Sequence, residues 1–574
     1  MSNGSCYPHY RGRVIHTLDG IWDFHLSDGA ADPAAPDLDA VVYDDRLPVP
    51  GVFDTLPRYA ARRGTAYYRT FVSVTPGARL MLKCSGLGMW GAFFWDGKRI
   101  GIQDLPYSEM EFCFDAGKGS EHELVAVIDN RFDFERQPLM SPFFDFYCHG
   151  GIFRTLAIHE LPAVALDRAQ VRVTDLAAGK VRVEVSVSGN KLPDAIRIST
   201  AFDDEAPVLR RLALRGGKAK FTAALADKRV WNCESPVLHT LKVTLGSETL
   251  VERFGLRTVK TEKGKILLNG EPVRLLGYCR HEAHPEFGPA LPAQIIAEDF
   301  QLLQQVGCNF VRGSHYPQDP RFLDLCDEKG IMVWEESLGW GNTPEQITAP
   351  HFAAAQLRQL APMVKKSGNH PSVILWGFLN EGASADPSCR PLYRKMIDGL
   401  HKLDASRPVT YATKCFIRDL NFDLADVISL NIYPGWYAEH REQYHPTAEL
   451  APKYDSFLAF LHEHGFDDKP MIMSEVGAGA IYGFRDRFRT FWTEEYQADL
   501  LEEILKYFFS RDRICGISLW QFIDCRTYAS AYALSRPRSF NNKGIFDEYR
   551  RGKLGAEVVA RYFRKHRGNG SGTL

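Results

Sequence analysis

Val373-Ile374-Leu375-Trp376, followed by Gly377-Phe378-Leu379-Asn380-Glu381, is the stretch of this chain that indicates its fold most directly. It begins as a short apolar run, typical of a buried strand, and ends in an amide and a carboxylate. Comparable runs alternate with helix-like stretches along the second half of the chain, at residues 273–277, 310–312, 331–334, 427–430, 471–474 and 516–520. Such alternation predicts a parallel sheet, and seven or eight units of this length favour a closed (β/α)8 barrel over residues 259–574.

The residues before the predicted barrel have the pattern of β-sandwiches. From residue 1 to about 165, short apolar and aromatic runs are interrupted by Gly, Pro, Asp and Asn, as in an all-β domain. From 166 to 258 apolar and polar residues alternate more regularly, for example over 181–187, which predicts a second sandwich of immunoglobulin size. The expected architecture is therefore multidomain, with two β-sandwiches followed by a C-terminal α/β barrel.

The composition is that of a folded protein without a strong net charge. At 574 residues the chain is longer than the roughly 250–300 residues over which a single core grows, which agrees with three domains. Lys and Arg total 69 against 71 for Asp and Glu, a net charge of -2. No overall field therefore favours nucleic acid or a lipid surface, and we expect a small-molecule partner, no nucleic acid and no membrane.

The cysteines indicate a reducing compartment. All 12 lie between Cys6 and Cys525 without any Cys-x-x-Cys pair, so the sequence predicts neither a zinc site nor a disulfide framework. The first 25 residues contain no apolar run of signal-peptide length, and no stretch approaches the roughly 18 apolar residues of a membrane span. The expected location is cytoplasmic.

Two glutamates are candidates for bond-breaking chemistry. Glu381 ends the opening stretch, and Glu475 follows the run Met471-Ile472-Met473-Ser474. The carboxyl ends of barrel strands meet on one rim, where catalytic groups concentrate. Retaining hydrolysis of a glycoside needs one carboxylic acid and one carboxylate about 5–5.5 Å apart. Either glutamate alone fits a helix cap or a salt bridge equally well, but Asn380 beside Glu381 adds an amide suited to a sugar hydroxyl.

Four motifs, in the same order along the chain, resemble glycoside hydrolase family 2. They are Leu18-Asp19-Gly20-Ile21-Trp22, Arg312-Gly313-Ser314-His315-Tyr316-Pro317, Trp376-Gly377-Phe378-Leu379-Asn380-Glu381 and Ser474-Glu475. The resemblance covers nearly the whole chain and implies a jelly-roll, sugar-binding-like domain over 1–165, an immunoglobulin-like β-sandwich over 166–258 and a catalytic TIM barrel over 259–574. It also implies that Glu381 is the general acid/base and that Glu475 is the nucleophile, which forms a covalent glycosyl-enzyme intermediate.

A later tripeptide bears on the sugar. Asn541-Asn542-Lys543 resembles the Asn-x-Lys signature of family members that cleave β-glucuronides. A Lys ammonium beside an Asn amide can hold a sugar carboxylate by charge-assisted hydrogen bonds, and a neutral sugar would leave the lysine unpaired. Without the resemblance, Asn-Asn-Lys-Gly is also a good turn sequence. The prediction is a retaining exo-β-glucuronidase that acts on a small glucuronide or an oligosaccharide, and the resemblance suggests a homo-oligomer.

Further residues are implied by the resemblance as contacts of the sugar or of the nucleophile. A tyrosine suits this role because its hydroxyl can donate to a carboxylate and keep it ionised. For Asp145 a loop-closing hydrogen bond is an alternative, and for Trp520 a place in the core is an alternative to stacking on the sugar. The implied contacts are Asp145, His315, Asn380, Asn431, Tyr433, Tyr437 and Trp520.

Two departures from the family pattern keep related activities open. Where the better-known members place an arginine near the sugar carboxylate, this chain has Pro537 between Arg536 and Arg538. Either arginine can substitute, so a β-galacturonidase, which differs at C4 of the sugar, remains an alternative. The stretch 280–285 reads like that of family galactosidases and keeps a β-galactosidase open.

Other classes have less support in the sequence. Glu335-Glu336-Ser337 lacks the Glu-x-His pair that holds magnesium in the large galactosidases, and the chain has no His-Glu-x-x-His motif of metallohydrolases. We therefore expect no metal and no cofactor. A carbohydrate-binding protein with an inactive barrel would lack one of the two glutamates, and both are present. The leaving-group side of the site is expected to involve residues 338–352.

Overall fold

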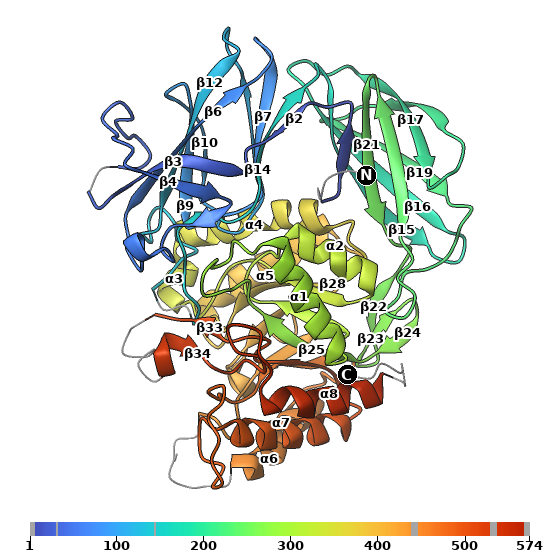
Figure 1. Cartoon of the computed structure of the whole chain (residues 1–574). Helices are drawn as coiled ribbons and strands as arrows, with labels where there is room; N and C mark the ends of the chain where they lie inside the picture. The colour runs from blue at the N-terminus through green and yellow to red at the C-terminus, as the bar shows by residue number, and fades with distance from the viewer. Residues whose placement is uncertain (1–5, 30–31, 143–144, 438–445, 529–535, 568–574) are drawn as a thin grey trace.

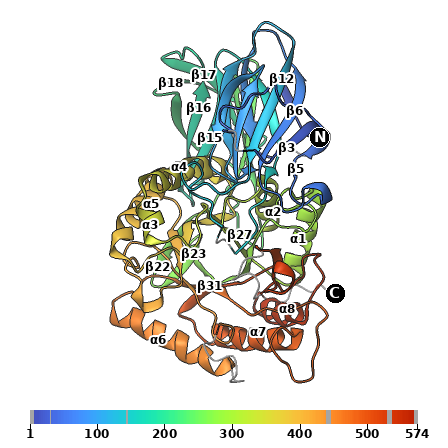
Figure 2. The ribbon, with the colours of Figure 1, turned by 90° about the vertical axis from the view of Figure 1, so that its left-hand side faces the viewer.

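Two β-sandwiches lie side by side on one side of a (β/α)8 barrel in this computed structural model (Figure 1). The structure describes residues 6–29, 32–142, 145–437, 446–528 and 536–567. The view turned by 90° shows the same arrangement, with both sandwiches on the same side of the barrel (Figure 2). The fold class predicted from the sequence is confirmed.

The first sandwich packs a six-stranded sheet against a four-stranded sheet. Buried aromatic side chains, among them Trp22, Phe24 and Phe93, fill the space between them. The sheets are β10-β9-β12-β6-β3-β4 and β11-β7-β14-β2, and β5, β8 and β13 form a small third sheet. The strands are β2 (Ile15–Thr17), β3 (Gly20–Ser27), β4 (Asp45–Val49), β5 (Gly51–Val52), β6 (Thr65–Ser73), β7 (Arg79–Cys84), β8 (Leu87–Gly88), β9 (Trp90–Trp95), β10 (Lys98–Gln103), β11 (Met110–Asp115), β12 (Glu121–Asp129), β13 (Gly151–Ile152) and β14 (Leu156–Leu161).

The second sandwich contains a strand from the beginning of the chain. β1 (His9–Arg11) pairs antiparallel with β21, so this sandwich includes residues that precede the predicted range 166–258. The period-two pattern of 181–187 buries Val181, Val183 and Val185 on one face of β16, as a half-buried strand requires. The strands are β15 (Ala165–Asp175), β16 (Lys180–Ser188), β17 (Ala195–Phe202), β18 (Val208–Ala213), β19 (Lys218–Ala224), β20 (His239–Leu245) and β21 (Glu248–Phe254).

The barrel closes with eight parallel strands. They are β25 (Leu275–Arg280), β26 (Phe310–Gly313), β27 (Met332–Glu336), β28 (Val373–Asn380), β29 (Val409–Thr413), β30 (Ile428–Asn431), β31 (Met471–Val476) and β32 (Ile514–Leu519). The seven apolar runs seen in the sequence correspond to seven of them. The eighth, β29, has the sequence Val-Thr-Tyr-Ala-Thr, and its threonines interrupt the apolar pattern although the whole strand is buried.

Close packing explains one residue of the opening stretch. A Cβ added at Gly377 on β28 would lie 1.9 Å from Trp334 Nε1 on the neighbouring strand β27. Only glycine allows the tryptophan to fill this part of the barrel interior. The apolar stretch 373–379 is buried throughout, as expected for a strand enclosed by helices.

Helices surround the barrel, and short elements complete the chain. α2 begins at the cap Asp319 with Pro320 in its first turn and ends at Gly330, which has φ 71, a common way to start and stop a helix. None of the described helices is both long enough and apolar enough to cross a membrane. The helices are α1 (Ala293–Gln305), α2 (Pro320–Lys329), α3 (Pro344–Thr348), α4 (Pro350–Ser367), α5 (Arg390–Leu403), α6 (Leu450–Glu463), α7 (Glu494–Phe509) and α8 (Leu554–His566). The remaining elements are β22 (Val259–Glu262), β23 (Lys265–Leu268), β24 (Glu271–Val273), β33 (Cys525–Arg526), β34 (Phe540–Asn541), η1 (Pro57–Tyr59), η2 (Pro387–Cys389), η3 (Phe416–Arg418), η4 (Pro446–Glu449) and η6 (Pro537–Ser539).

The first sandwich is attached to the barrel rim by the segment before β14. Arg154, which is 2% exposed, donates through Nη2 to Glu282 Oε2 at 2.8 Å and to the carbonyl oxygen of Pro317 at 2.7 Å. The backbone N–H of Tyr147 donates to the carbonyl oxygen of Arg526 at 2.8 Å. These contacts bring residues 145–154 to the carboxyl ends of the barrel strands.

Candidate active site

Strands β28, β30 and β31 place the two predicted catalytic glutamates on one rim of the barrel. Glu381 follows the last residue of β28, Asn431 is the last residue of β30, and Glu475 lies near the end of β31. Asn431 and Glu475 are register partners in the parallel pairing of β30 with β31. The barrel therefore gathers groups that are far apart in the sequence, on the face where catalytic residues of such barrels lie.

Glu475 accepts two hydrogen bonds in a buried environment. Tyr433 Oη donates to its Oε2 at 2.6 Å, and Arg312 Nη1 donates to its Oε1 at 2.9 Å. Arg312 is itself held by Glu336, whose Oε2 accepts from Arg312 Nε at 2.9 Å. Burial and the negative charge of Glu381 raise the pKa of Glu475 to about 8, and Arg312 and Tyr433 oppose this rise. The negative charge of Glu381 thus disfavours ionisation of Glu475, and the donors Arg312 and Tyr433 favour it.

Glu381 uses its two carboxyl oxygens differently. Oε1 accepts from Asn431 Nδ2 at 3.1 Å, whereas Oε2 lies 3.3 Å from Lys414 Nζ. The orientation of Asn431 is fixed because Ser474 Oγ donates to its Oδ1 at 2.7 Å. The backbone of Glu381 has φ 52, a left-handed conformation that is uncommon outside glycine and that occurs often at functional sites.

Three buried polar atoms on this rim have no hydrogen-bond partner among the described residues. They are Asn380 Nδ2, His315 Nε2 and Asp145 Oδ1. His315 Nε2 lies 3.9 Å from Glu475 Oε1, while Asn380 Oδ1 is used by Arg312 Nη2 at 2.8 Å. Because buried polar groups are nearly always hydrogen bonded, these atoms can bind water or a polar ligand.

A second cluster combines two cations with one acid. Arg536 Nη2 donates to Asp145 Oδ2 at 2.6 Å, and Asn541 Nδ2 donates to the same oxygen at 2.8 Å. Lys543 Nζ donates to Tyr437 Oη at 2.7 Å and lies 3.5 Å from Asn541 Oδ1. Asn541, Lys543 and Arg536 are buried. Asp145 belongs to the first sandwich, so this cluster spans two domains.

Two side chains of this cluster, Lys543 and Asp145, have shifted pKa values. Among the described residues, two basic side chains, Arg536 and Lys543, face the single carboxylate of Asp145. Burial, together with Arg536, lowers the pKa of Lys543 well below its usual value, and burial raises the pKa of Asp145. An anion in this pocket would restore the ordinary protonation of Lys543.

Two other predicted sugar contacts, Arg538 and Trp520, do not belong to the cluster around Asp145. Arg538 donates through Nη1 to Glu548 Oε1 at 2.6 Å and has a half-exposed side chain, so Arg536 is the arginine that reaches Asp145. Trp520 is buried and stacks on His315, with ring centroids 5.2 Å apart and an interplanar angle of 13°. The indole of Trp520 therefore packs against the imidazole of His315.

A buried ion pair holds the segment 541–544 in place. Lys553 Nζ donates to both carboxyl oxygens of Asp524 at 2.8 Å. Asp524 also accepts from Asn542 Nδ2 at 3.1 Å and from the backbone N–H of Gly544 at 2.9 Å. Strand pairing of β34 with β33 adds support, so Lys543 stands on a rigid segment.

Comparison with known proteins places the chain in a family. Residues 259–566 match the family model "Glycosyl hydrolases family 2, TIM barrel domain". The chain belongs to glycoside hydrolase family 2. It is therefore a glycoside hydrolase, as the motifs implied.

Relatives with named activities cover almost the whole chain. The sequence is 27% identical to a β-glucuronidase of Paenibacillus borealis over 95% of this chain and 96% of that protein. It is 25% identical to the β-glucuronidase of Sus scrofa, over 97% and 92% respectively. Among solved structures, a family 2 β-galacturonidase from Eisenbergiella tayi bound to galacturonate is 32% identical, with a TM-score of 0.89 over 97% of this chain and 98% of that chain.

Three charged residues that contact the glutamates or their partners were not singled out from the sequence. Arg312 was part of a motif without an assigned role, and Glu336 was considered only for its failure to match a magnesium motif. Lys414 was missed because it follows β29, the strand without an apolar run. A search for charged residues directly after every strand, including threonine-rich ones, would have found it.

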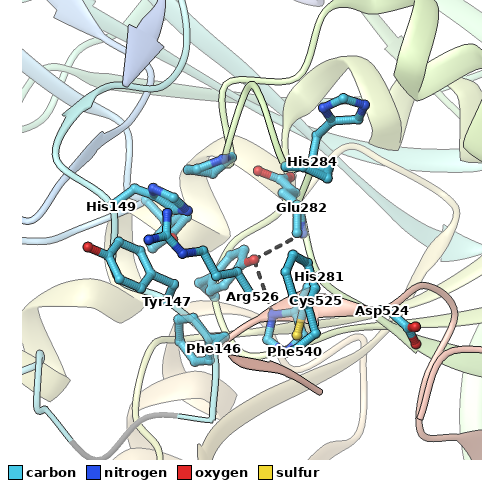
Figure 3. Close-up of a pocket in the computed structure, with 15 residues that line it drawn as sticks. Phe146, Tyr147, His149, His281, Glu282, His284, Asp524, Cys525, Arg526 and Phe540 are labelled. Atoms are coloured by element: carbon cyan, nitrogen blue, oxygen red, sulfur yellow. Dashed lines mark hydrogen bonds between the residues drawn. The ribbon is translucent and has the colours of Figure 1, made fainter. Parts of the chain in front are cut away.

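A small cavity lies between the barrel and the first sandwich (Figure 3). Phe146, Tyr147 and His149 line it from the sandwich, and His281 and Glu282 line it from the barrel. Its volume of about 20 Å³ suits one water molecule rather than a sugar. This cavity is therefore a packing gap at the domain junction and not the substrate site.

One group of side chains elsewhere could offer three ligands to a metal. The ligand atoms of Asp324, Asp327 and His370 lie within 4.8 Å of one another. Arg253 Nη2 already lies 2.7 Å from Asp324 Oδ1 and 3.9 Å from Asp327 Oδ2, so a guanidinium neutralises this group. It lies before the amino ends of β27 and β28, away from the rim of the glutamates.

Proposed function

We propose that this family 2 enzyme is a retaining exo-β-glucuronidase. The observation that carries the proposal is the buried cluster of Arg536, Asn541 and Lys543 beside the two glutamates. Among the described residues this cluster offers two basic side chains and one carboxylate, and a glucuronate carboxylate would stabilise the ammonium form of Lys543. A neutral glucoside or galactoside would leave a buried cation uncompensated, which is costly.

The two glutamates have distinct roles in the proposed mechanism. Glu475 attacks the anomeric carbon as a carboxylate, because Arg312 and Tyr433 both donate to it and favour its ionised form. Glu381 acts as the carboxylic acid and donates its proton to the departing oxygen. After the leaving group departs, Glu381 removes a proton from water, and this water hydrolyses the covalent glycosyl-enzyme intermediate.

The buried polar atoms account for the remaining sugar contacts. Asn380 Nδ2 can donate to a sugar hydroxyl, Asp145 Oδ1 can accept from one, and His315 Nε2 can do either. Because Asn541 and Lys543 are buried, the proposed site holds the sugar carboxylate at its inner end. This arrangement supports removal of a terminal sugar rather than cleavage within a chain.

A β-galacturonidase is the second candidate. The 32% identical protein of Eisenbergiella tayi is a β-galacturonidase with bound galacturonate. In this chain Arg536 pairs with Asp145, next to the place where the sugar hydroxyls must lie. Galacturonate keeps the carboxylate and changes only the C4 hydroxyl, so the same cluster can hold it.

Four 4-nitrophenyl β-glycosides test this proposal: the glucuronide, the galacturonide, the glucoside and the galactoside. We expect kcat/KM to be highest for the glucuronide, and both acidic sugars to exceed both neutral ones. Faster cleavage of the galacturonide would support the carboxylate site but would show that the preferred sugar is galacturonate. Dominant cleavage of a neutral sugar would exclude the proposal. Proton NMR of the first-formed product should show the β-anomer, since retention requires it.

A further inference from the structure

Lys414 stands on the side of Glu381 that faces away from Asn431. Its Nζ lies 3.3 Å from Glu381 Oε2, while Asn431 occupies Oε1. Among the described residues, Glu381 is the only acid whose carboxylate lies within 4 Å of this ammonium. Just over half of the Lys414 side chain, 56%, is exposed, against 13% for Glu381. The lysine thus lies where the site opens to solvent.

The position of Lys414 follows from the chemistry of Glu381. Oε1 is held by the buried amide of Asn431, whereas Oε2 lies on the side where Lys414 is exposed, so we assign the proton that Glu381 transfers to Oε2. The departing oxygen must therefore approach Oε2, the oxygen beside Lys414. When Glu381 carries this proton it is neutral, and Lys414 then loses its only carboxylate partner among the described residues.

The loop that carries Lys414 is held firmly. Thr413 Oγ1 accepts from the backbone N–H of Cys415 at 3.0 Å and is hydrogen bonded to Ser384 Oγ at 2.9 Å. Buried Asp419 accepts from Tyr411 Oη at 2.7 Å and from the backbone N–H of Asn421 at 2.8 Å. Only the side chain of Lys414 has to adjust, which reduces the entropy cost of binding a partner there.

We propose that Lys414 forms a recognition site for a negatively charged group on the leaving group of the substrate. The preferred substrates would then be glucuronides whose leaving group carries a carboxylate or a sulfate near the glycosidic oxygen, as in an acidic phenol or an acidic sugar. In the substrate complex Lys414 pairs with this group. After its departure the ammonium returns to the ionised carboxylate of Glu381. The inference rests on the proposed function and gives Lys414 a role on the leaving-group side of the same site.

A simpler role for Lys414 makes a different prediction. If it only stabilises the ionised form of Glu381, its removal alters the pH dependence of kcat/KM equally for every leaving group. The charged groups that face Glu381 are Lys414, Glu475, Asp145 and His315. Three of them lie on the sugar side, so Lys414 is the one that can distinguish leaving groups.

The test compares 3-carboxyphenyl and 3-carbamoylphenyl β-D-glucuronide, which differ in charge and little in shape. We expect the ratio of their kcat/KM values to fall about fivefold in Lys414→Met relative to the wild type, the upper range for a partly exposed ion pair. Because this ratio is compared between the wild type and the variant, the difference in reactivity between the two phenols cancels. The fall should shrink in 0.5 M salt because the contact is screened, and Lys414→Arg should retain at least half of the wild-type preference.

Lys395→Met removes the same charge from the exposed face of α5 and serves as the matched control. Ratios that agree within twofold in the wild type and Lys414→Met would overturn the inference, as would an equal fall in Lys395→Met. Phenyl β-D-glucuronide, which has no acidic group, is measured in parallel. If the wild type does not cleave phenyl β-D-glucuronide, the proposed function is wrong as well. If the wild type cleaves it and Lys414→Met leaves the ratio of kcat/KM values unchanged, only the role of Lys414 is wrong.

Discussion

At the scale of single residues, the hydrogen bonds around each carboxyl group distinguish Glu381 from Glu475. Glu475 accepts from Arg312 and from Tyr433, whereas Glu381 accepts from an amide and faces a partly exposed lysine. Two donors directed at one buried carboxylate favour its ionised form. Burial and Glu381 oppose this by raising the pKa of Glu475 to about 8, so the proposed roles of nucleophile and acid rest on the hydrogen-bond donors around each carboxyl group.

Substitution of each glutamate should produce a distinct kinetic defect. Glu475→Gln should lower kcat by about 10⁴-fold or more for every glucuronide, because the nucleophile is lost. Glu381→Gln should lower kcat/KM by about 10²–10⁴-fold for the phenyl glucuronide and by much less for the 2,4-dinitrophenyl glucuronide, which needs no acid. Steady-state rates with both substrates measure this difference.

Glu557→Gln, on the exposed side of α8, is the control for both variants and should behave as the wild type. Equal losses for the two leaving groups in Glu381→Gln would show that this residue is not the general acid.

Binding of glucuronate should be coupled to proton uptake at pH values between the pKa of Lys543 in the free enzyme and its pKa in the complex. In the free enzyme burial and Arg536 lower the pKa of Lys543 well below its usual value. A bound carboxylate stabilises the ammonium and raises this pKa, so between the two pKa values each binding event takes up a proton and affinity falls as pH rises. Calorimetric titration of glucuronate in two buffers with different ionisation enthalpies measures the uptake. Binding that releases protons, or affinity that rises with pH in this range, would refute the assignment.

At the scale of elements, short connected segments hold the site in place. The segment 541–544 is held by Asp524 and Lys553, which come from the end of the barrel and from the residue before α8. The loop after β29 is fixed in a similar way by Asp419. Function on such barrels resides in these connections, and the strands supply a rigid frame.

Removal of the lysine in the buried ion pair should destabilise the enzyme and weaken acid-sugar binding together. Lys553→Met leaves the carboxylate of Asp524 buried without its cation, which should cost about 3–5 kcal/mol in the free energy of unfolding. KM for the glucuronide should also rise, because Asn542 and Gly544 lose their anchor. Urea unfolding and steady-state kinetics on the same preparation measure both effects.

The double variant Lys553→Met with Asp524→Leu removes the unpaired charge and should recover part of the stability. A single variant as stable as the wild type would show that the ion pair does not hold this segment.

The sequence predicts the elements with local patterns and leaves out those that depend on distant contacts. Seven barrel strands have apolar runs, so their positions follow from the sequence, whereas β29 is buried despite its threonines because Thr410 Oγ1 donates to the carbonyl oxygen of Val427 at 2.8 Å. Pairing of β1 with β21 joins residues more than 200 positions apart and has no local signal. For the same reason the sequence left open whether Arg536 or Arg538 faces the sugar.

At the scale of the whole molecule, the first sandwich contributes to the site and to its stability. Asp145 reaches Arg536 and Asn541 from the sandwich, and Arg154 enters the barrel to meet Glu282. The barrel by itself would lack the acid of the cluster that balances one of its two cations. Both domains therefore contribute charged groups to the proposed sugar site.

Loss of Arg154 should uncouple the sandwich from the barrel. Arg154→Met leaves Glu282 buried and unpaired, so we expect a loss of about 3–5 kcal/mol in stability and a fall in kcat/KM as Asp145 shifts. Arg58→Met is the matched control on the same sandwich, because Arg58 is 54% exposed where it pairs with Asp44 and should contribute about 0–1 kcal/mol. Scanning calorimetry and kinetics on both variants test this, and equal behaviour of the two would argue against the interface.

The selectivity of the enzyme for an acidic over a neutral sugar tests the central claim most directly. The measurement is the ratio of kcat/KM for 4-nitrophenyl β-D-glucuronide to that for the β-D-glucoside, in the wild type and in Lys543→Met. A contact between a charged donor and a buried carboxylate is worth about 1.5–3 kcal/mol, so the ratio should fall about 10- to 150-fold in the variant. A wild-type ratio near one, or a ratio that Lys543→Met leaves unchanged, would contradict the proposal that this site recognises a sugar acid.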